Sequence, residues 1–261
     1  MDALAIIPSR YGSTRLPGKP LLADTGWPML RHVYERVRQA RSVSSVLVAT
    51  DDERIAAAVR AFGGEAAMTD PAHGSGTERI AEAAARLPAS SVDVILNVQG
   101  DEPEIEPEHL DRLVAAHRGS GRPISTLACP FPKDARAGAG SPSDPACVKV
   151  VLKRTGEGDP AFADALYFSR SAIPAPPAAG PIARPQDWLM HVGVYAFSPE
   201  SLAAFAAAPA GRLERRERLE QLRALEMGWS IAVAEVDCAA PGVDTPEDYA
   251  AFVARWKASR P

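Results

Sequence analysis

The sequence has few of the features that would place it outside ordinary soluble proteins. Its 261 residues include three cysteines, Cys129, Cys147 and Cys238, which form neither a CxxC pair nor an even set. We expect all three to be small buried apolar residues. No stretch reaches the roughly 18 apolar residues that a membrane span needs, and residues 1–8 lack a basic start before an apolar run. We therefore expect a cytoplasmic protein without stable membrane association.

An excess of one charge sign is also missing. The chain has 29 Lys and Arg against 33 Asp and Glu, and its net charge of -4 gives no general attraction to nucleic acid. Hydrophobic residues make up 46% and charged residues 24%, which excludes a disordered or fibrous chain. A chain of this length can bury a sizeable core, and no internal repeat is visible.

Short apolar runs alternate with amphipathic segments in the first half of the chain. The runs at 4–7, 46–49 and 92–98 show no alternation of period two, which is typical of strands buried on both faces of a parallel sheet. Amphipathic segments of helical length lie at 29–40, 53–62, 76–87 and 107–116. This order predicts an α/β fold with a doubly wound, mostly parallel sheet.

Residues 130–195 interrupt this alternation. Pro, Gly, Ala and Ser are dense at 135–145 and 174–185, around strand-like patches at 148–152 and 165–168. We interpret 130–195 as a lobe with mobile loops and a candidate dimer surface, inserted in a single domain that spans 1–261. The chain then closes with predicted helices at 199–207 and near 213–227, a strand at 230–236 and a last helix from 246.

A basic segment with two glycines directly follows the first predicted strand. Residues 8–20, PSRYGSTRLPGKP, contain Arg10, Arg15 and Lys19, which can neutralise phosphate oxygens, while the glycines let backbone N–H groups approach an anion. The segment matches neither GxxxxGK[ST] nor GxGxxG. Because parallel sheets bind ligands at the carboxyl ends of their strands, we favour a triphosphate-binding loop over a solvated basic turn.

Two aspartates follow other predicted strands. Asp101 lies in NVQGDEP after the run 92–98, and Asp244 precedes a helix start with Thr245 as N-cap and Pro246 at the first position. Helix capping alone would explain each of them. A triphosphate brings about four negative charges, however, and the three loop cations leave a deficit that Mg²⁺ would offset. Magnesium is usually held by one or two carboxylates plus phosphates, so the two aspartates are candidate metal ligands.

A series of motifs along the chain makes the predicted function more specific. They are IIPSRYGSTRLPGKPL at 6–21, HGSGTER at 73–79, NVQGDEP at 97–103, LYFSR at 166–170, HVGVY at 191–195, LEQLR at 219–223 and GVDTPED at 242–248. In this order the motifs resemble those of the 3-deoxy-manno-octulosonate (Kdo) cytidylyltransferases, also called CMP-Kdo synthetases. The resemblance implies a fold of nucleotide-diphospho-sugar transferase type, CTP and Kdo as substrates, CMP-Kdo and pyrophosphate as products for lipopolysaccharide synthesis, Mg²⁺ as cofactor, and a homodimer.

The resemblance also assigns roles to residues of this chain. The nucleotide-binding set is Pro8, Ser9, Arg10, Arg15, Lys19, Ser75 and Arg79, with the last two near the cytidine. Asp101 and Asp244 would bind Mg²⁺ and form the catalytic set together with Lys19. The sugar-binding set is Gln99, Arg170, His191, Tyr195, Glu220 and Gln221, which makes 130–195 a lobe for sugar binding and dimerisation. Arg170 is the natural partner of the sugar carboxylate, because its guanidinium binds carboxylates in a bidentate manner.

Ordinary structural roles are the alternatives for the sugar-binding set. Tyr195 lies in an apolar run, His191 would serve equally as a structural histidine, and Glu220 and Gln221 lie in a segment dense in charge. At the level of function, the alternatives are a cytidylyltransferase for a sialic acid or an amino derivative of Kdo, a glycosyltransferase of similar fold, and a nucleotide sensor without catalysis. A glycosyltransferase would need a DxD motif, which QGDE at 99–102 lacks.

Overall fold

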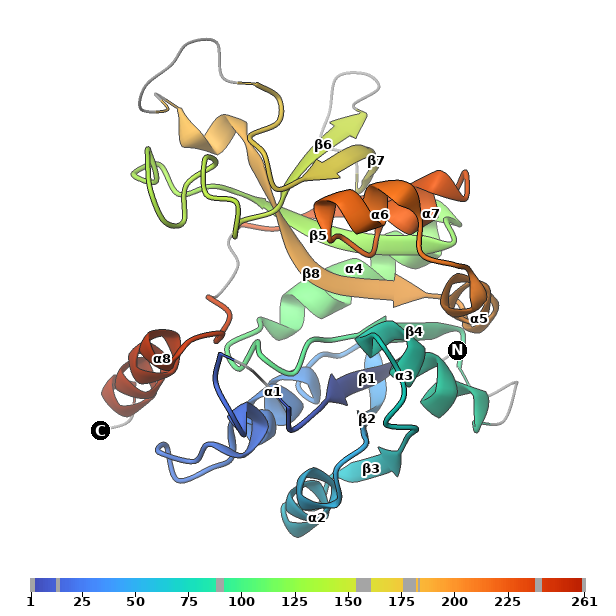
Figure 1. Cartoon of the computed structure of the whole chain (residues 1–261), viewed down its shortest axis with the longest axis vertical. Helices are drawn as coiled ribbons and strands as arrows, with labels where there is room; N and C mark the ends of the chain where they lie inside the picture. Colours follow the sequence, from blue (N-terminus) through green and yellow to red (C-terminus); the bar gives the residue numbers. More distant parts are fainter. Residues whose placement is uncertain are drawn as a thin grey trace. The chain divides into compact units, whose positions relative to one another are not determined.

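The structure is a computed structural model that describes residues 3–12, 15–87, 92–153, 161–175, 182, 184–237 and 241–259 (Figure 1). It divides into two compact units, one of residues 1–111 and 240–261 and one of residues 112–239. Cys238 and most of the Pro-rich segment 174–185 lie outside the described residues. Within the described ranges, no helix is long and apolar enough to cross a membrane.

The first unit contains a parallel sheet. Its strands are β1 (Ala3–Ser9), β2 (Val43–Thr50), β3 (Glu65–Met68) and β4 (Val94–Asn97), in the order β3-β2-β1-β4. Its helices are α1 (Met29–Val37), α2 (Glu53–Ala61), α3 (Gly76–Ala85) and α8 (Pro246–Ala258). The predicted strands and helices of this region are confirmed, with ends shifted by a few residues. Strand β3 was not predicted, because Glu65–Met68 is short and lacks β-branched residues.

The register of this sheet sets the position of the candidate site. Ile6 of β1 lies opposite Leu47 of β2 on one side and Asn97 of β4 on the other. The three strands are parallel, so their carboxyl ends reach the same edge of the sheet. The segments that follow β1 and β4 therefore begin side by side, and these are the predicted loop and the segment that carries Asp101.

The second unit contains a mixed sheet. Its strands are β5 (Ile124–Pro130), β6 (Lys149–Lys153), β7 (Ala163–Ser169), β8 (Leu189–Phe197) and β9 (Ile231–Glu235). Their order is β8-β5-β9-β7-β6, and β6 also pairs with β8. Among the strand pairs that the structure describes in this unit, only β5 with β9 is parallel. The pairs of β5 with β8, β6 with β7, β6 with β8, and β7 with β9 are antiparallel. The prediction of a mostly parallel sheet is therefore wrong for this unit. Among the described residues no α-helix lies between β5 and β8, whereas crossovers between parallel strands usually contain one.

The helices of the second unit also differ from the prediction. They are α5 (Pro199–Ala207), α6 (Arg212–Glu217) and α7 (Leu222–Glu226), and α4 (Pro107–Ser120) contains the boundary between the units. The single helix predicted near 213–227 is wrong, because Arg218 adopts a left-handed conformation with φ 56° that ends α6. A helical pattern of side chains does not reveal such a residue.

The unit boundaries differ from the predicted ones, and one of two described cysteines is less buried than predicted. The second unit extends beyond the predicted lobe 130–195 at both ends, because β5 and β9 pair with each other and with strands inside that segment. That the segment is an insertion stays a prediction. Cys129 is buried as predicted, whereas Cys147 is only half-buried, with its Sγ 3.9 Å from a carboxylate oxygen of Asp144.

Candidate active site

The predicted loop residues line one cavity in the first unit. The cavity has a volume of about 310 Å³ and lies at the carboxyl ends of β1 and β4. Its lining consists of Pro8, Ser9, Arg10, Arg15, Lys19, Pro20, His73, Gly74, Ser75, Gly76, Arg79, Gln99, Gly100, Asp101 and Asp244. Every residue of the predicted nucleotide-binding set and both predicted metal ligands are among them. The structure therefore brings together side chains that are far apart in the sequence.

Two glycines allow the walls of this cavity to meet at Pro8. A Cβ atom at Gly100 would lie 3.2 Å from the carbonyl oxygen of Pro8, and one at Gly76 would lie 3.2 Å from the Pro8 ring. Larger residues would push the start of α3 and the segment after β4 away from β1. Ser9 is 5% exposed at this junction, and its Oγ has no hydrogen-bond partner among the described residues. A buried hydroxyl without a partner is available to a ligand.

Lys19 forms ion pairs with both predicted metal ligands. Its Nζ lies 2.9 Å from Oδ2 of Asp101 and 3.2 Å from Oδ1 of Asp244, and it donates a further hydrogen bond of 2.9 Å to the carbonyl oxygen of Val243. The Lys19 side chain is only 13% exposed. Arg15 approaches the same carboxylate, with 3.0 Å between its Nη2 and Oδ1 of Asp244. Two cations and two carboxylates thus form one balanced ion cluster.

Backbone contacts hold Asp244 beside Asp101. The N–H of Val243 donates to the carbonyl oxygen of Asp101 at 2.8 Å. The cap of α8 is Thr245, whose Oγ1 accepts the N–H of Asp248, while the Asp248 carboxylate accepts the N–H groups of Asp244 and Thr245. The Asp244 carboxylate faces Lys19 and Arg15, so capping of α8 does not account for it.

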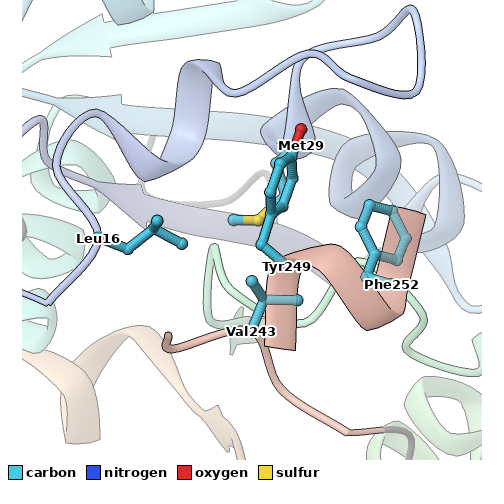
Figure 2. Close-up of a cluster of buried hydrophobic side chains, with 5 residues drawn as sticks. All are labelled: Leu16, Met29, Val243, Tyr249 and Phe252. Carbon is cyan, nitrogen blue, oxygen red and sulfur yellow. The ribbon is translucent and has the colours of Figure 1, made fainter. Parts of the chain in front are cut away.

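An apolar cluster fixes both chain segments of this ion cluster. It consists of Leu16, Met29, Val243, Tyr249 and Phe252, and Figure 2 shows these side chains gathered against α8. Leu16 precedes Lys19 by three residues, and Val243 directly precedes Asp244. The Tyr249 hydroxyl also accepts the N–H of Asp24 at 2.9 Å. Packing of α8 therefore holds the loop and Asp244 in the same place.

Most of the predicted sugar-binding residues belong to the second unit. The Tyr195 hydroxyl donates to Oε1 of Gln221 at 3.1 Å, and the rings of His191 and Tyr195 are 5.5 Å apart. Gln221 is 3% exposed, and its Nε2 has no hydrogen-bond partner among the described residues. Glu220 lies beside it with Oε1 3.6 Å from Nη2 of Arg223. These residues form a polar group that keeps one unused amide donor.

His191 has structural partners within the same unit. Its Nε2 lies 2.9 Å from Oγ1 of Thr126, and its ring packs edge-on against Phe168 at 5.1 Å. Burial lowers the pKa of His191 to about 3, so the imidazole is neutral at physiological pH. A neutral ring can accept or donate one hydrogen bond. Its role in sugar binding stays a prediction.

Comparisons with known proteins identify the family. A family model described as Cytidylyltransferase matches residues 4–231. The 3-deoxy-manno-octulosonate cytidylyltransferase of Anaeromyxobacter dehalogenans strain 2CP-C is 49% identical over 245 residues, which cover 93% of each chain. The chain belongs to the 3-deoxy-manno-octulosonate cytidylyltransferase family. The resemblance inferred from the sequence motifs is confirmed.

Two further similarities bear on this cytidylyltransferase family. The 8-amino-3,8-dideoxy-manno-octulosonate cytidylyltransferase of Shewanella woodyi is 43% identical over 251 residues, covering 95% of this chain and 96% of that one. A solved structure of CMP:2-keto-3-deoxy-manno-octonic acid synthetase complexed with CTP is 40% identical, with a TM-score of 0.85 over 99% of this chain and 100% of that one. The chain therefore shares the α/β fold of that synthetase.

A divalent metal fits the two cavity aspartates of this cytidylyltransferase. The described residues contain no group of three or more His, Cys, Asp or Glu side chains that could hold a metal. Asp101 and Asp244 nevertheless converge on one ammonium group, and two carboxylates with substrate phosphates suffice for Mg²⁺. Burial raises the pKa of the neighbouring Glu102 to about 8, and the charge of Asp101 adds to this shift. The sequence predicted no role for Glu102.

The predicted cytidine contacts have partners within the protein. The guanidinium of Arg79 is 4% exposed and donates to Oγ1 of Thr69 and, at 2.9 Å, to Oδ2 of Asp51. Ser75 caps α3, since its Oγ accepts the N–H of Glu78. The Glu78 carboxylate in turn accepts the N–H of Gly74. Contacts of Ser75 and Arg79 with cytidine stay predictions.

Gln99 and Arg170 are the remaining members of the predicted sugar-binding set. Gln99 lines the cavity of the first unit, and its Nε2 donates to Oδ1 of Asn97 at 2.9 Å. Arg170 belongs to the second unit, where its guanidinium donates to the carbonyl oxygens of Pro145, Glu217 and Arg218. Since a guanidinium has five N–H groups, it keeps further donors for a carboxylate.

Lys149, which was not predicted from the sequence, binds the backbone carbonyl of Arg170. Lys149 is fully buried in β6, and its Nζ donates to the carbonyl oxygens of Asp144, Cys147 and Arg170 at 2.8, 2.6 and 2.6 Å. Burial lowers the pKa of Lys149. A lysine within a strand pattern is usually a surface residue, so the sequence carries no signal for this role.

Proposed function

We propose that this protein is a Mg²⁺-dependent cytidylyltransferase. It transfers CMP from CTP to the anomeric hydroxyl of Kdo and releases pyrophosphate, which supplies CMP-Kdo for lipopolysaccharide synthesis. The family of the chain supports this activity, and the solved structure of a similar synthetase is described as complexed with CTP. The observation that carries the proposal is the convergence of Lys19, Asp101 and Asp244 in the cavity formed by the loop after β1.

The cavity supplies contacts for a nucleoside triphosphate. Arg10, Arg15 and Lys19 line it and carry positive charges that can neutralise phosphate oxygens. The buried Oγ of Ser9 can donate to a further oxygen, and Pro8 completes the wall beside it. Ser75 would lie near the cytidine at the start of α3, together with Arg79. This arrangement orients the α-phosphorus for attack.

The reaction is a substitution at the α-phosphorus. The anomeric oxygen of the sugar forms a bond to phosphorus while the bond to the pyrophosphate oxygen breaks, and the hydroxyl proton is lost to solvent. Lys19 and Arg15 offset the negative charge that develops on the pyrophosphate. Asp101 and Asp244 would hold Mg²⁺, which when bound supplies Lewis-acid stabilisation of the phosphate charge.

The second unit supplies the candidate contacts for the sugar. The unused amide donor of Gln221 and the hydroxyl of Tyr195 suit sugar hydroxyl groups. Glu220 and neutral His191 can accept hydrogen bonds from others. Arg170 keeps N–H groups that can bind the Kdo carboxylate. Gln99, which lines the cavity of the first unit, is the last residue that we propose for sugar binding.

The substitutions Asp101→Asn and Asp244→Asn test the proposed metal ligands. We expect each to lower pyrophosphate release from CTP and Kdo by about a hundredfold or more, because a lost charge of this kind weakens transition-state stabilisation. Asp134→Asn, which changes an exposed aspartate of the second unit, is the control and should keep full activity. Circular dichroism checks that all variants fold. Near-normal CMP-Kdo formation by either test variant contradicts the two-aspartate site.

A second candidate substrate is an amino derivative of Kdo. The observation in its favour is the 43% identity to the 8-amino-3,8-dideoxy-manno-octulosonate cytidylyltransferase. Pyrophosphate release with Kdo, 8-amino-3,8-dideoxy-manno-octulosonate and a sialic acid separates the candidates. We expect the highest kcat/KM with Kdo, since the relatives with higher identity are named for that sugar. A higher value for another sugar acid would change the assigned substrate.

We also propose that the protein acts as a homodimer in the cytoplasm. The dimer follows from the resemblance in sequence motifs, and the cytoplasmic location follows from the use of CTP. Analytical ultracentrifugation measures the mass of the assembly in solution, and a mass of one chain would contradict the dimer. Cell fractionation with an antibody against the protein tests its location.

A further inference from the structure

Lys19 has no free N–H group for a substrate in the structure. An ammonium group has three N–H donors. Those of Lys19 lie within 2.9 to 3.2 Å of Oδ2 of Asp101, Oδ1 of Asp244 and the carbonyl oxygen of Val243. To donate to a phosphate, Lys19 must therefore give up one of these acceptors. Its side chain is 13% exposed, so water contributes little to its solvation.

A divalent cation on the two aspartates would meet the same ammonium group. Magnesium binds carboxylate oxygens at about 2.1 Å, so it would lie on the order of 5 Å or less from Nζ of Lys19. Like charges at this distance repel each other, and the repulsion is strong where little water screens it. The two carboxylates therefore cannot hold the ammonium and the divalent cation equally well at the same time.

We propose that Lys19 and the divalent cation compete for Asp101 and Asp244, and that a bound triphosphate shifts this competition in favour of the cation. Phosphate oxygens give the ammonium new acceptors, so Lys19 can leave the carboxylates. The cation then takes its place on them. This inference rests on the proposed function, and it adds that nucleotide and metal bind with positive coupling through one side chain.

The charges around the cavity support this exchange. Lys19 and Arg15 contact the two carboxylates, so these four side chains are balanced. Arg79 is paired with Asp51. Among the lysine and arginine side chains that line the cavity, only Arg10 has no ion pair with a described residue. An incoming triphosphate therefore meets one unpaired cation. Release of Lys19 toward the phosphates, with a divalent cation on the aspartates, offsets most of the charge of the triphosphate.

The experiment measures Mn²⁺ binding without nucleotide. Free Mn²⁺ is followed by electron paramagnetic resonance during titration of wild type, Lys19→Met and Arg10→Met. The Lys19→Met variant keeps an unbranched side chain and loses the ammonium. Arg10→Met is the matched control, because it removes one positive charge from the same cavity and takes no partner from Asp101 or Asp244. Lys19→Gln serves as a second variant in case Lys19→Met does not fold.

Lys19→Met should bind Mn²⁺ at least tenfold more tightly than wild type, while Arg10→Met should differ from wild type by less than about threefold. Without metal, Lys19→Met should also have a lower Tm than wild type, and Mn²⁺ should raise this Tm more than that of wild type. Equal Mn²⁺ affinity of Lys19→Met, Lys19→Gln and Arg10→Met would overturn the competition.

A separate assay keeps the two hypotheses distinct. Pyrophosphate release by wild type with CTP and Kdo tests the proposed function alone. If wild type is active and the Lys19 variants bind Mn²⁺ no more tightly, only the competition is refuted. If wild type is inactive but the Lys19 variants bind Mn²⁺ more tightly, the proposed function fails while the competition for the two aspartates stands.

Discussion

Replacement of Phe252 by alanine should loosen the candidate site from a distance. Phe252 is 1% exposed and packs in the cluster with Leu16, Met29, Val243 and Tyr249 (Figure 2). A Phe to Ala change in such a core costs about 3 to 5 kcal/mol, since it loses the transfer free energy of the ring and leaves a cavity. For a chain of this size, 1 kcal/mol lowers Tm by roughly 2 to 4 °C, so we expect a drop of about 10 °C.

The same change should weaken CTP binding at temperatures where the variant is folded. Leu16 and Val243 lose a packing partner, and they precede Lys19 and Asp244 by three residues and one residue. A cavity beside them allows both segments to move, so the distances between the charged groups of the ion cluster vary more. We expect the KM for CTP to rise several-fold. Thermal unfolding by circular dichroism and pyrophosphate release measure the two effects.

Phe205→Ala is the matched control for this prediction. Phe205 is 2% exposed and lies in the second unit, where its ring is 5.7 Å from that of Phe197 and packs under Arg223. The loss of stability should be similar, but the KM for CTP should stay near that of wild type. A Phe252→Ala variant with less than about 1 kcal/mol of destabilisation, or an equal rise of this KM in both variants, would refute the reasoning.

Two further predictions concern the second unit. Since the folded pKa of His191 is about 3 and an unfolded histidine takes up a proton near 6.5, only the unfolded state gains a proton between these values, and stability falls as pH falls. Between pH 7 and 5, the free energy of unfolding of wild type should therefore fall by about 2 kcal/mol more than that of His191→Gln, as measured by urea unfolding. An equal fall in both proteins would contradict the neutral ring. Gln221→Leu removes the unused amide donor, so the KM for Kdo should rise about five- to tenfold. The KM for CTP should not change. An unchanged KM for Kdo would exclude Gln221 from the sugar site.

The sequence by itself determined the family and much of the first unit. The apolar run before residue 8 predicts a buried strand, and the rule that parallel sheets bind ligands at the carboxyl ends of strands places the loop 8–20 at a site. Both Asp101 and Asp244 were inferred in the same way. The parallel strands β1 and β4 end at the same edge, which brings the loop to Asp101. The backbone contact of Val243 with Asp101 and the packing of α8 bring Asp244 into the same cavity.

Only the tertiary structure decided how these groups meet. No pattern in the sequence shows that Lys19 uses its three donors on Asp101, Asp244 and the Val243 carbonyl, since these partners are 82 to 225 residues away. The mixed sheet of the second unit and the left-handed Arg218 were missed for a similar reason. Local patterns report which face of a segment is buried, whereas strand pairing and ion contacts depend on what the rest of the chain brings beside it.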